Sequence, residues 1–155
     1  LRATHSDPKI NNVLLDRKTG VGICIVDLDT CMPGTVLWDF GDLARNTSIP
    51  AAEDEQDFAK AHVDNELFEA VARGFLMECG NLLTKEEIRL LPRSACLLAL
   101  TLGVRFLTDY LNGDKYFRVH KEQHNLERAR TQFEIVRGML AAGDRLERVV
   151  QKCLR

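Results

Sequence analysis

The chain has 155 residues, 45% of them hydrophobic, and a formal net charge of −2. This length and composition suit one compact domain with a single core. The balanced charge gives no basic field of the kind that attracts nucleic acid or an anionic membrane surface, so neither partner is expected. The longest uncharged apolar-rich stretch, residues 94–104, is shorter than the roughly 20 residues of a membrane-spanning helix, which predicts a soluble chain.

The first polar cluster lies in residues 5–12, directly before an apolar segment. Its members are His5, Asp7, Lys9 and Asn12, in the pattern H-x-D-x-K-x-x-N. This is the pattern of a protein-kinase catalytic loop with the second residue changed. In such a loop the aspartate serves the acceptor hydroxyl and the asparagine binds magnesium, so the spacing indicates a phosphoryl-transfer site.

Residues 13–26 are predicted to form a β-hairpin with a charged turn. The second strand, residues 22–26, is a short β-branched apolar run and reads as a buried strand. The hairpin would bring together Asn12, which precedes the first strand, and Asp27, which follows the second. An amide oxygen and one carboxylate are ligands that Mg²⁺ accepts when phosphates and water supply the rest. The pair therefore predicts a site for Mg-ATP.

The sequence D-F-G at residues 39–41 is not the predicted metal site, although D-F-G carries the metal-binding aspartate of protein kinases. It lies too far from Asn12, and no strand is predicted before it, because residues 30–35 read as a loop with Pro-Gly punctuation. A helix over residues 39–47 is expected instead. Residues 48–57 are expected to form a solvated loop.

Capping residues and apolar periodicity predict helices in the rest of the chain. Asp64 is a suitable N-cap for a helix that stops at Gly80. Thr84 and Glu87 form a capping box that starts a second helix. These signals place two helices between the loop at residues 48–57 and the most apolar part of the chain.

A third helix is predicted to open at Pro92 and to end before residues 112–114. It is apolar nearly all round, which predicts that it is the central buried helix. A fourth helix is expected over residues 125–142, followed by Gly143 and a short closing helix over residues 145–152. The predicted class is α+β and mostly helical.

The motifs of residues 1–45 resemble those of the aminoglycoside phosphotransferase and choline kinase-like family, small-molecule kinases with the protein-kinase fold. The wording of residues 4–16 is most similar to the N-acetylhexosamine 1-kinase subgroup. The resemblance implies the C-terminal lobe of a protein-kinase-like fold with the N-terminal lobe missing, since no Gly-rich loop, strand lysine or partner-glutamate helix precedes the catalytic loop. Residues 1–45 would then hold the catalytic and metal-binding loops, and residues 46–155 a helical substrate-side subdomain.

The resemblance implies an ATP-dependent phosphotransferase that moves the γ-phosphoryl group of Mg-ATP to a hydroxyl of a small molecule, a sugar such as an N-acetylhexosamine. Asp7 would be the catalytic residue that accepts the acceptor's proton, and Lys9 would reach the γ-phosphoryl oxygens. Asn12 and Asp27 would hold Mg²⁺ and through it the ATP. Asp29 is left with two equal interpretations, a ligand of a second ion or a cap of the loop.

Two further residues are expected to support the catalytic loop through hydrogen bonds. His5 resembles the family's histidine that packs under the loop, and Asp42 resembles the aspartate at the helix start that braces it. Ser6 replaces the glycine usual in the broader family, a change that the loop is expected to tolerate.

Other functions are weighed against the sugar kinase. Another small alcohol, such as an aminoglycoside or a choline-like compound, is an open alternative acceptor, and a non-catalytic kinase-like binding module is another possibility. A sulfatase is rejected, because Thr35 stands where the C-x-P-x-R motif that would start at Cys31 requires arginine. The expected partners are the acceptor and the missing N-terminal lobe. Without that lobe the chain is expected to show little kinase activity and to be open to self-association.

Five cysteines are present, an odd number without C-x-x-C spacing. They are predicted to be free, mostly buried thiols, which points to the cytoplasm. The spacing gives no support to a zinc site that combines them with His62, His120 or His124. These histidines are expected to face solvent or to lie at helix ends.

Overall fold

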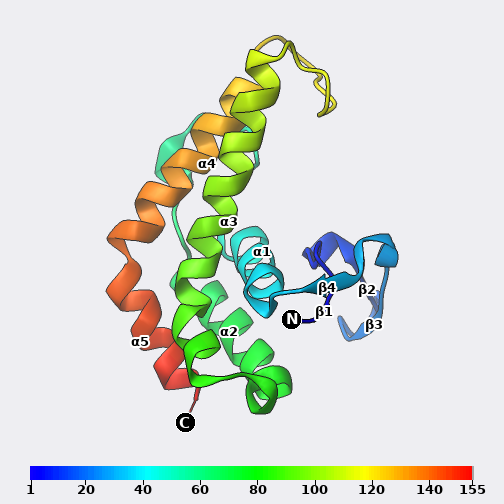
Figure 1. Ribbon diagram of the computed structural model, residues 1–155, viewed down its shortest axis with the longest axis vertical. Helices are drawn as coiled ribbons and strands as arrows, with labels where there is room; N and C mark the ends of the chain where they lie inside the picture. Colours follow the sequence, from blue (N-terminus) through cyan, green and yellow to red (C-terminus); the bar gives the residue numbers. More distant parts are fainter. Residues whose placement is uncertain (155) are drawn as a thin grey trace.

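The computed structural model describes residues 1–154 and confirms the mainly helical α+β class (Figure 1). Two small antiparallel sheets lie near the N-terminus, one pairing β1 with β4 and the other pairing β2 with β3. The strands are β1 (Arg2–Thr4), β2 (Val13–Leu15), β3 (Gly22–Ile25) and β4 (Met32–Gly34). The α-helices of the described residues are α1 (Val36–Ser48), α2 (Asn65–Cys79), α3 (Lys85–Leu111), α4 (His124–Ala141) and α5 (Gly143–Cys153). Single 3-10 turns lie at Ile10–Asn12, Leu28–Thr30, Phe58–Lys60 and Gly80–Leu82.

The helix α3 is the centre of the bundle and packs against α1, α4 and α5. Figure 1 shows α3 and α4 side by side along the long axis of the molecule, with the two small sheets projecting from the bundle beside α1. The core is built from apolar side chains of all five helices. Phe40 of α1 lies at its centre, with its ring centroid 6.0 Å from that of Phe68 and 5.1 Å from that of Phe75.

The predicted break between two helices at Pro92 is wrong, because α3 runs without interruption from Lys85 to Leu111. The predicted capping box is present at the start of α3, between Thr84 and Glu87. Proline fixes a φ that suits a helix, and it costs one backbone hydrogen bond. Pro92 is buried with its neighbour Leu91, and this packing offsets that cost.

Because α3 is continuous, it forms an apolar helix longer than the sequence pattern predicts. With 27 residues, it is long and apolar enough to cross a membrane by length and composition alone. One such helix is weak evidence for a membrane span, because the core helix of a soluble protein passes the same test, and 44% of the most apolar window of α3 is buried inside this fold. The predicted burial all round is also wrong, because Leu97, Leu100 and Val104 form an exposed stripe on its outer side.

The glycine of the D-F-G sequence is a packing residue. Gly41 lies in the middle of α1, where an added Cβ would come within 2.7 Å of the backbone oxygen of Ser94 on α3. The two helices can approach this closely only because position 41 has no side chain. The prediction that no strand precedes the D-F-G sequence is wrong, because β4 ends just before α1; this strand pairs with β1 and is not part of the hairpin that follows Asn12.

We expect Gly41→Ala to lower the free energy of unfolding by about 1–3 kcal/mol, because the backbone of α3 must move to make room. Gly74→Ala in α2 is the matched control, since its added Cβ meets nothing within 4 Å. The control is expected to raise stability by about 0.5–1 kcal/mol through helix propensity alone. Urea unfolding of both variants measures the difference, and a stabilised Gly41→Ala protein would contradict the close approach of α1 and α3.

The predicted hairpin is present, with Val13 opposite Ile25 and Leu14 opposite Cys24. The prediction that its second strand is buried is wrong, however. Ile23 and Ile25 are 66% and 55% exposed, because the hairpin projects from the bundle and nothing in residues 1–154 covers it. The β-branched residues at alternating positions therefore indicate that the segment is a strand, but they do not indicate that the strand is buried.

Two segments predicted as loops are more ordered than expected. Residues 30–35 include β4, whose Met32 and Gly34 pair with Thr4 and Arg2 of β1. The segment 48–57 is attached to the bundle at both ends, since Ser48 and Ile49 are buried and the backbone oxygen of Glu55 accepts a 2.8 Å hydrogen bond from Thr131 of α4. Neither contact has a local sequence signal.

The five cysteines are free thiols. Cys79, Cys96 and Cys153 are half-buried, whereas Cys24 and Cys31 are exposed, so the prediction that most are buried is wrong. Burial raises the pKa of the Cys96 thiol above its ordinary value, which lowers its reactivity.

Candidate active site

The loop between β1 and β2 brings four of the predicted site residues together. The Oδ2 atom of Asp7 lies 2.6 Å from the Nζ atom of Lys9 and 3.1 Å from the Nδ2 atom of Asn12. The same Nδ2 atom donates to the backbone oxygen of Asp7 at 2.9 Å and to Oδ2 of Asp27 at 3.3 Å. Asn12 is buried and joins the catalytic loop to the end of the hairpin.

The hairpin brings Asn12 and Asp27 together, although they are fifteen positions apart in the sequence. Asn12 immediately precedes β2, Asp27 follows β3, and the backbone N–H of Val26 donates to the oxygen of Asn12 at 2.9 Å. Asp27 has a left-handed backbone with φ of 64° and starts the 3-10 turn Leu28–Thr30. Aspartate tolerates this conformation better than most residues, so the chain can turn sharply here and leave the carboxylate beside Asn12.

The amide of Asn12 and the carboxylate of Asp27 suit a hard cation such as Mg²⁺. Within residues 1–154 there is no cluster of three or more histidine, cysteine or acidic side chains that could hold a metal ion. An ion held by this pair would therefore take most of its ligands from phosphate groups and water, as Mg²⁺ commonly does. Asp29 is exposed and makes no hydrogen bond to Asp7, Asn12 or Asp27.

The backbone of the catalytic loop is braced from both sides. The carboxylate of Asp39 accepts hydrogen bonds from the backbone N–H groups of His5 and Ser6, each at 2.8 Å. The hydroxyl of Thr30 donates to the backbone oxygen of His5 at 2.7 Å. The ring atom Nε2 of His5 lies 3.2 Å from the backbone oxygen of Val26, which places His5 between the loop and the hairpin as a structural residue.

The expectation that Asp42 braces the loop needs correction. Its Oδ1 atom accepts hydrogen bonds from Arg45 at 2.9 Å and from Asn46 at 3.1 Å, both within α1. The bracing contacts come from Asp39, one helical turn earlier. The physical reason is that α1 begins at Val36, with Thr35 as its N-cap, three residues before the predicted start. This shift puts Asp39 in the first turn, beside the loop.

Ser6 occupies a position where the backbone favours glycine, because its φ is 69°. Its hydroxyl lies 3.1 Å from that of Thr4, which in turn donates to the backbone oxygen of Met32 at 2.8 Å. The hydrogen bond that the N–H of Ser6 donates to Asp39, and the one that Thr30 donates to the backbone oxygen of His5, hold the unusual conformation in place.

We expect Asp39→Ala to lower stability by about 1–3 kcal/mol, because two part-buried backbone N–H groups lose their acceptor. Asp144→Ala is the matched control, since Asp144 also lies in the first turn of a helix and is exposed. Hydrogen exchange at His5 and Ser6 should become faster in Asp39→Ala and stay unchanged in the control. Equal exchange rates in both variants would contradict the bracing role.

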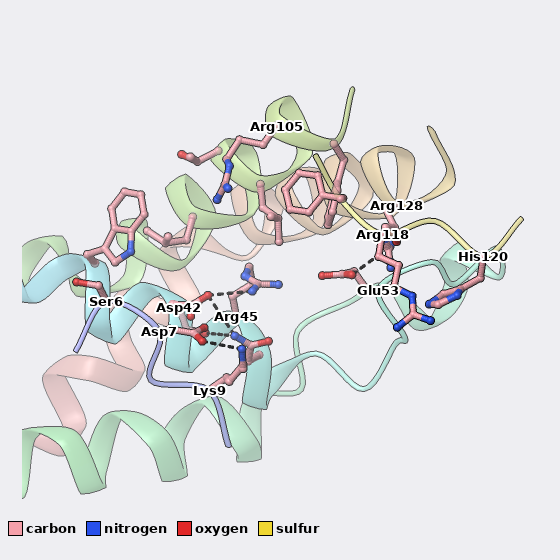
Figure 2. Close-up of a pocket in the computed structure, with 17 residues that line it drawn as sticks. Ser6, Asp7, Lys9, Asp42, Arg45, Glu53, Arg105, Arg118, His120 and Arg128 are labelled. Atoms are coloured by element: carbon pink, nitrogen blue, oxygen red, sulfur yellow. Dashed lines mark hydrogen bonds and ion pairs between the residues drawn. The ribbon is translucent and has the colours of Figure 1, made fainter. Parts of the chain in front are cut away.

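A cavity of about 430 Å³ opens beside the catalytic loop, within the range of roughly 300–1,000 Å³ that is usual for small-molecule sites. Asp7 and Lys9 line it, whereas Asn12 and Asp27 do not. Figure 2 shows Asp7 and Lys9 at one end, next to Asp42 and Arg45, and Arg118, Arg128 and His120 at the other end. Asp7 therefore lies between the pair suited to a metal and the cavity.

Most of the residues that line the cavity were not found from the sequence. They come from α1, the loop at residues 53–54, α3, the α3–α4 loop and α4, and they carry no motif. The aromatic and basic ones are Trp38, Arg45, Arg105, Phe106, Phe117, Arg118, His120 and Arg128. The periodicity of α3 and α4 predicts their helices but does not indicate which side chains face a common space.

The buried carboxylate of Asp109 anchors the first part of the loop between α3 and α4. Asp109 accepts hydrogen bonds from the backbone N–H groups of Lys115, Tyr116 and Phe117 at 2.8–2.9 Å. Burial alone would raise the pKa of Asp109, but these N–H groups and Asn125 outweigh it, so the pKa lies below its ordinary value. This aspartate fixes the segment that leads to Arg118.

His124 is the first residue of α4 and so lies at a helix end, one of the two predicted places, and its side chain is buried. Its Nε2 atom lies 3.3 Å from Oδ2 of Asp54, and Lys121 approaches the same atom at 3.2 Å. Burial raises the pKa of Asp54, but the hydrogen bond and positive charge of Lys121, together with a backbone hydrogen bond, outweigh it, so the pKa lies below its ordinary value. These contacts tie the segment 48–57 to α4 beside the cavity.

Comparison with known proteins gives one family match. Residues 1–76 match the family model APH, described as the phosphotransferase enzyme family. The matched segment includes the catalytic loop, the hairpin with Asp27, and α1 with Asp39. The residues predicted to transfer or hold phosphate thus lie inside the matched segment. The helices α3 and α4, which line much of the cavity, lie outside it.

Proposed function

We propose that this protein supplies the catalytic loop and the acceptor site of an ATP-dependent small-molecule kinase. The starting point is the similarity of residues 1–76 to the phosphotransferase enzyme family. In this proposal residues 1–154 correspond to the C-terminal lobe of a kinase-like fold, with ATP and Mg²⁺ as co-substrate and cofactor. The observation that carries it is the place of Asp7, which contacts Asn12 of the metal pair and also lines the cavity.

The chemistry is a transfer of the γ-phosphoryl group. The acceptor oxygen forms a bond to the γ-phosphorus, the bond from that phosphorus to the β,γ-bridging oxygen breaks, and ADP leaves. Asp7 aligns the acceptor hydroxyl and takes its proton, a contribution of about 100- to 10,000-fold. Lys9 offsets the charge on the transferring group. Mg²⁺, when bound with ATP, neutralises charge on the phosphates.

We further propose that the acceptor is a sugar, with an N-acetylhexosamine phosphorylated at its anomeric hydroxyl as the first to examine. Three aromatic side chains, Trp38, Phe106 and Phe117, line the cavity, and their faces suit the apolar face of a pyranose ring. Asn46 and Thr101 also line it and offer hydrogen bonds to ring hydroxyls. Aminoglycosides and choline-like alcohols are cationic, and the several arginines of the cavity disfavour them.

The exposed hairpin supports a partner for this chain. Leu14, Leu15, Ile23 and Ile25 are each at least 50% exposed and lie on one small sheet next to the metal pair. Exposed apolar surface of this kind marks an interaction site. We propose that a nucleotide-binding lobe covers it in the active enzyme, and that the chain alone self-associates through it and turns over slowly. The free thiols suit a reducing compartment, so a cytoplasmic location is proposed.

The function is tested by following labelled γ-phosphoryl transfer from ATP to a panel of acceptors. The panel contains N-acetylglucosamine, N-acetylgalactosamine, choline and an aminoglycoside, and it is run with the chain alone and with a form that includes a nucleotide-binding lobe. The proposal expects a phosphorylated sugar and ADP in equal amounts from the longer form. Binding of ATP without transfer to any hydroxyl compound would favour the non-catalytic module.

A further inference from the structure

The charges that line the cavity do not balance. Each of its three carboxylates is paired with one cation. The pairs are Asp7 with Lys9 at 2.6 Å, Asp42 with Arg45 at 2.9 Å and Glu53 with Arg128 at 3.2 Å. Arg105 and Arg118 also line the cavity and make no ion pair with any residue in the described part of the chain. The cavity is left with positive charge that nothing in it neutralises.

Arg105 is held by aromatic rings. Its guanidinium carbon lies 5.5 Å from the ring centroid of Tyr116 and 5.2 Å from that of Phe117. One of its N–H groups donates to the hydroxyl of Tyr116 at 3.3 Å. A guanidinium stacked in this way keeps most of its N–H groups for a planar or tetrahedral anion.

Arg118 is placed by its backbone and not by its side chain. Its carbonyl oxygen accepts a 3.1 Å hydrogen bond from Arg128, and Asp109 holds the three residues before it. The side chain of Arg128 is only 14% exposed, and it lies over the ring of Phe106 at 5.3 Å. Because this support exists before any ligand arrives, less conformational entropy is lost on binding.

Figure 2 shows Arg118 across the cavity from Asp7 and Lys9, and Arg105 above Asp42 and Asp7, apart from Arg118. The two arginines without a carboxylate partner therefore face the cavity from different sides. An anionic group on a molecule that presents a hydroxyl to Asp7 would be attracted by both positive charges.

We propose that the acceptor carries an anionic group, a carboxylate or a phosphate ester, and that the positive charges of Arg105 and Arg118, which no carboxylate of the cavity neutralises, bind it there. The inference rests on the proposed function, because it assigns the cavity to the acceptor. It narrows the acceptor from any sugar to an acidic sugar derivative. Hydrogen bonds to a charged group contribute more than those between neutral groups, which gives the anion a large share of the affinity.

Calorimetric titration of the whole chain tests this with three matched sugars. They are N-acetylglucosamine, its 6-phosphate, and the derivative with a carboxylate at C6. At least one anionic sugar should bind about tenfold more tightly than the neutral sugar, and the advantage should shrink as salt is added. The two anionic sugars distinguish a phosphate site from a carboxylate site.

The variant Arg105→Gln/Arg118→Gln should lose this tenfold advantage and bind the neutral sugar as the parent does. Arg130→Gln is the matched control, because Arg130 is an exposed arginine of α4 that does not line the cavity. If neither anionic sugar binds more tightly than the neutral one, or if the double variant keeps the preference, the inference is overturned. Competition between the anionic sugar and Mg-ATP would also overturn it, since the arginines would then hold the nucleotide.

The same titration separates this inference from the proposed function. Asp7→Asn leaves both arginines in place, so it should keep the preference for the anionic sugar while phosphoryl transfer is lost. If the protein prefers anionic sugars but the longer form transfers no phosphoryl group, the kinase function is contradicted and the anion site still stands. If the longer form phosphorylates only neutral sugars, the anion site is contradicted and the kinase function still stands.

Discussion

Asp7→Asn is expected to reduce the turnover rate by about 100- to 10,000-fold, in the form of the enzyme that includes a nucleotide-binding lobe. Asparagine has nearly the same size and can still hydrogen bond with Lys9 and Asn12, but it cannot take a proton from the acceptor. Affinity for Mg-ATP should stay near that of the parent, because Asp7 addresses the acceptor. Steady-state kinetics together with calorimetric titration of Mg-ATP measures both quantities.

The exposed Asp144→Asn in α5 is the control for this variant, since it removes the same charge far from the loop. Its turnover rate should equal that of the parent. Near-normal turnover by Asp7→Asn on an acceptor that the parent phosphorylates would contradict the assignment of this loop as the active site.

Asp27→Asn should affect the nucleotide and not the acceptor. It removes the only carboxylate of the metal pair, so affinity for Mg-ATP should fall by about tenfold or more, and added Mg²⁺ should restore part of the activity. The backbone of Asp27 has a φ of 64°, which asparagine accepts as readily as aspartate. The variant should therefore fold as the parent does, and loss of binding would report the missing ligand.

Asp29→Asn is the comparison for Asp27→Asn. Asp29 lies two residues further along the same segment, is exposed, and makes no hydrogen bond to Asn12 or Asp27. If Asp29 only caps the loop, Asp29→Asn should leave the affinity for Mg-ATP unchanged. If Asp29 binds a second ion, Asp29→Asn should lower that affinity as well. If Asp27→Asn binds Mg-ATP as tightly as the parent, Asp27 is not the metal ligand.

The features that could be predicted from the sequence are those with a local physical cause. Asp64 caps α2 through the N–H groups of Glu66 and Leu67, and the capping box of α3 is formed as its residues indicate. The hairpin follows from two short apolar runs with a charged turn between them. Because a hairpin fixes which residues meet at its ends, the sequence also predicts that Asn12 and Asp27 lie together, and their side chains are 3.3 Å apart.

The features that could not be predicted depend on tertiary packing. The start of α1 at Val36 decides whether Asp39 or Asp42 faces the loop, and both are plausible by sequence. Burial of Leu91 and Pro92 decides that α3 is continuous. The cavity is the clearest case, because Arg105 and Arg118 come together with Asp7 only after α1, α3 and α4 have packed.

Asp7 is proposed to lie between a metal-phosphate site and an acceptor cavity, and a single NMR experiment on the form that includes a nucleotide-binding lobe tests this claim most directly. Manganese replaces magnesium in the presence of ATP, and the paramagnetic ion broadens the amide signals of nearby residues. The account predicts strong broadening at Asp7, Asn12 and Asp27 and little at Arg118 and His120, which lie across the cavity (Figure 2). Broadening centred on the residues across the cavity, or none at Asn12 and Asp27, would contradict it.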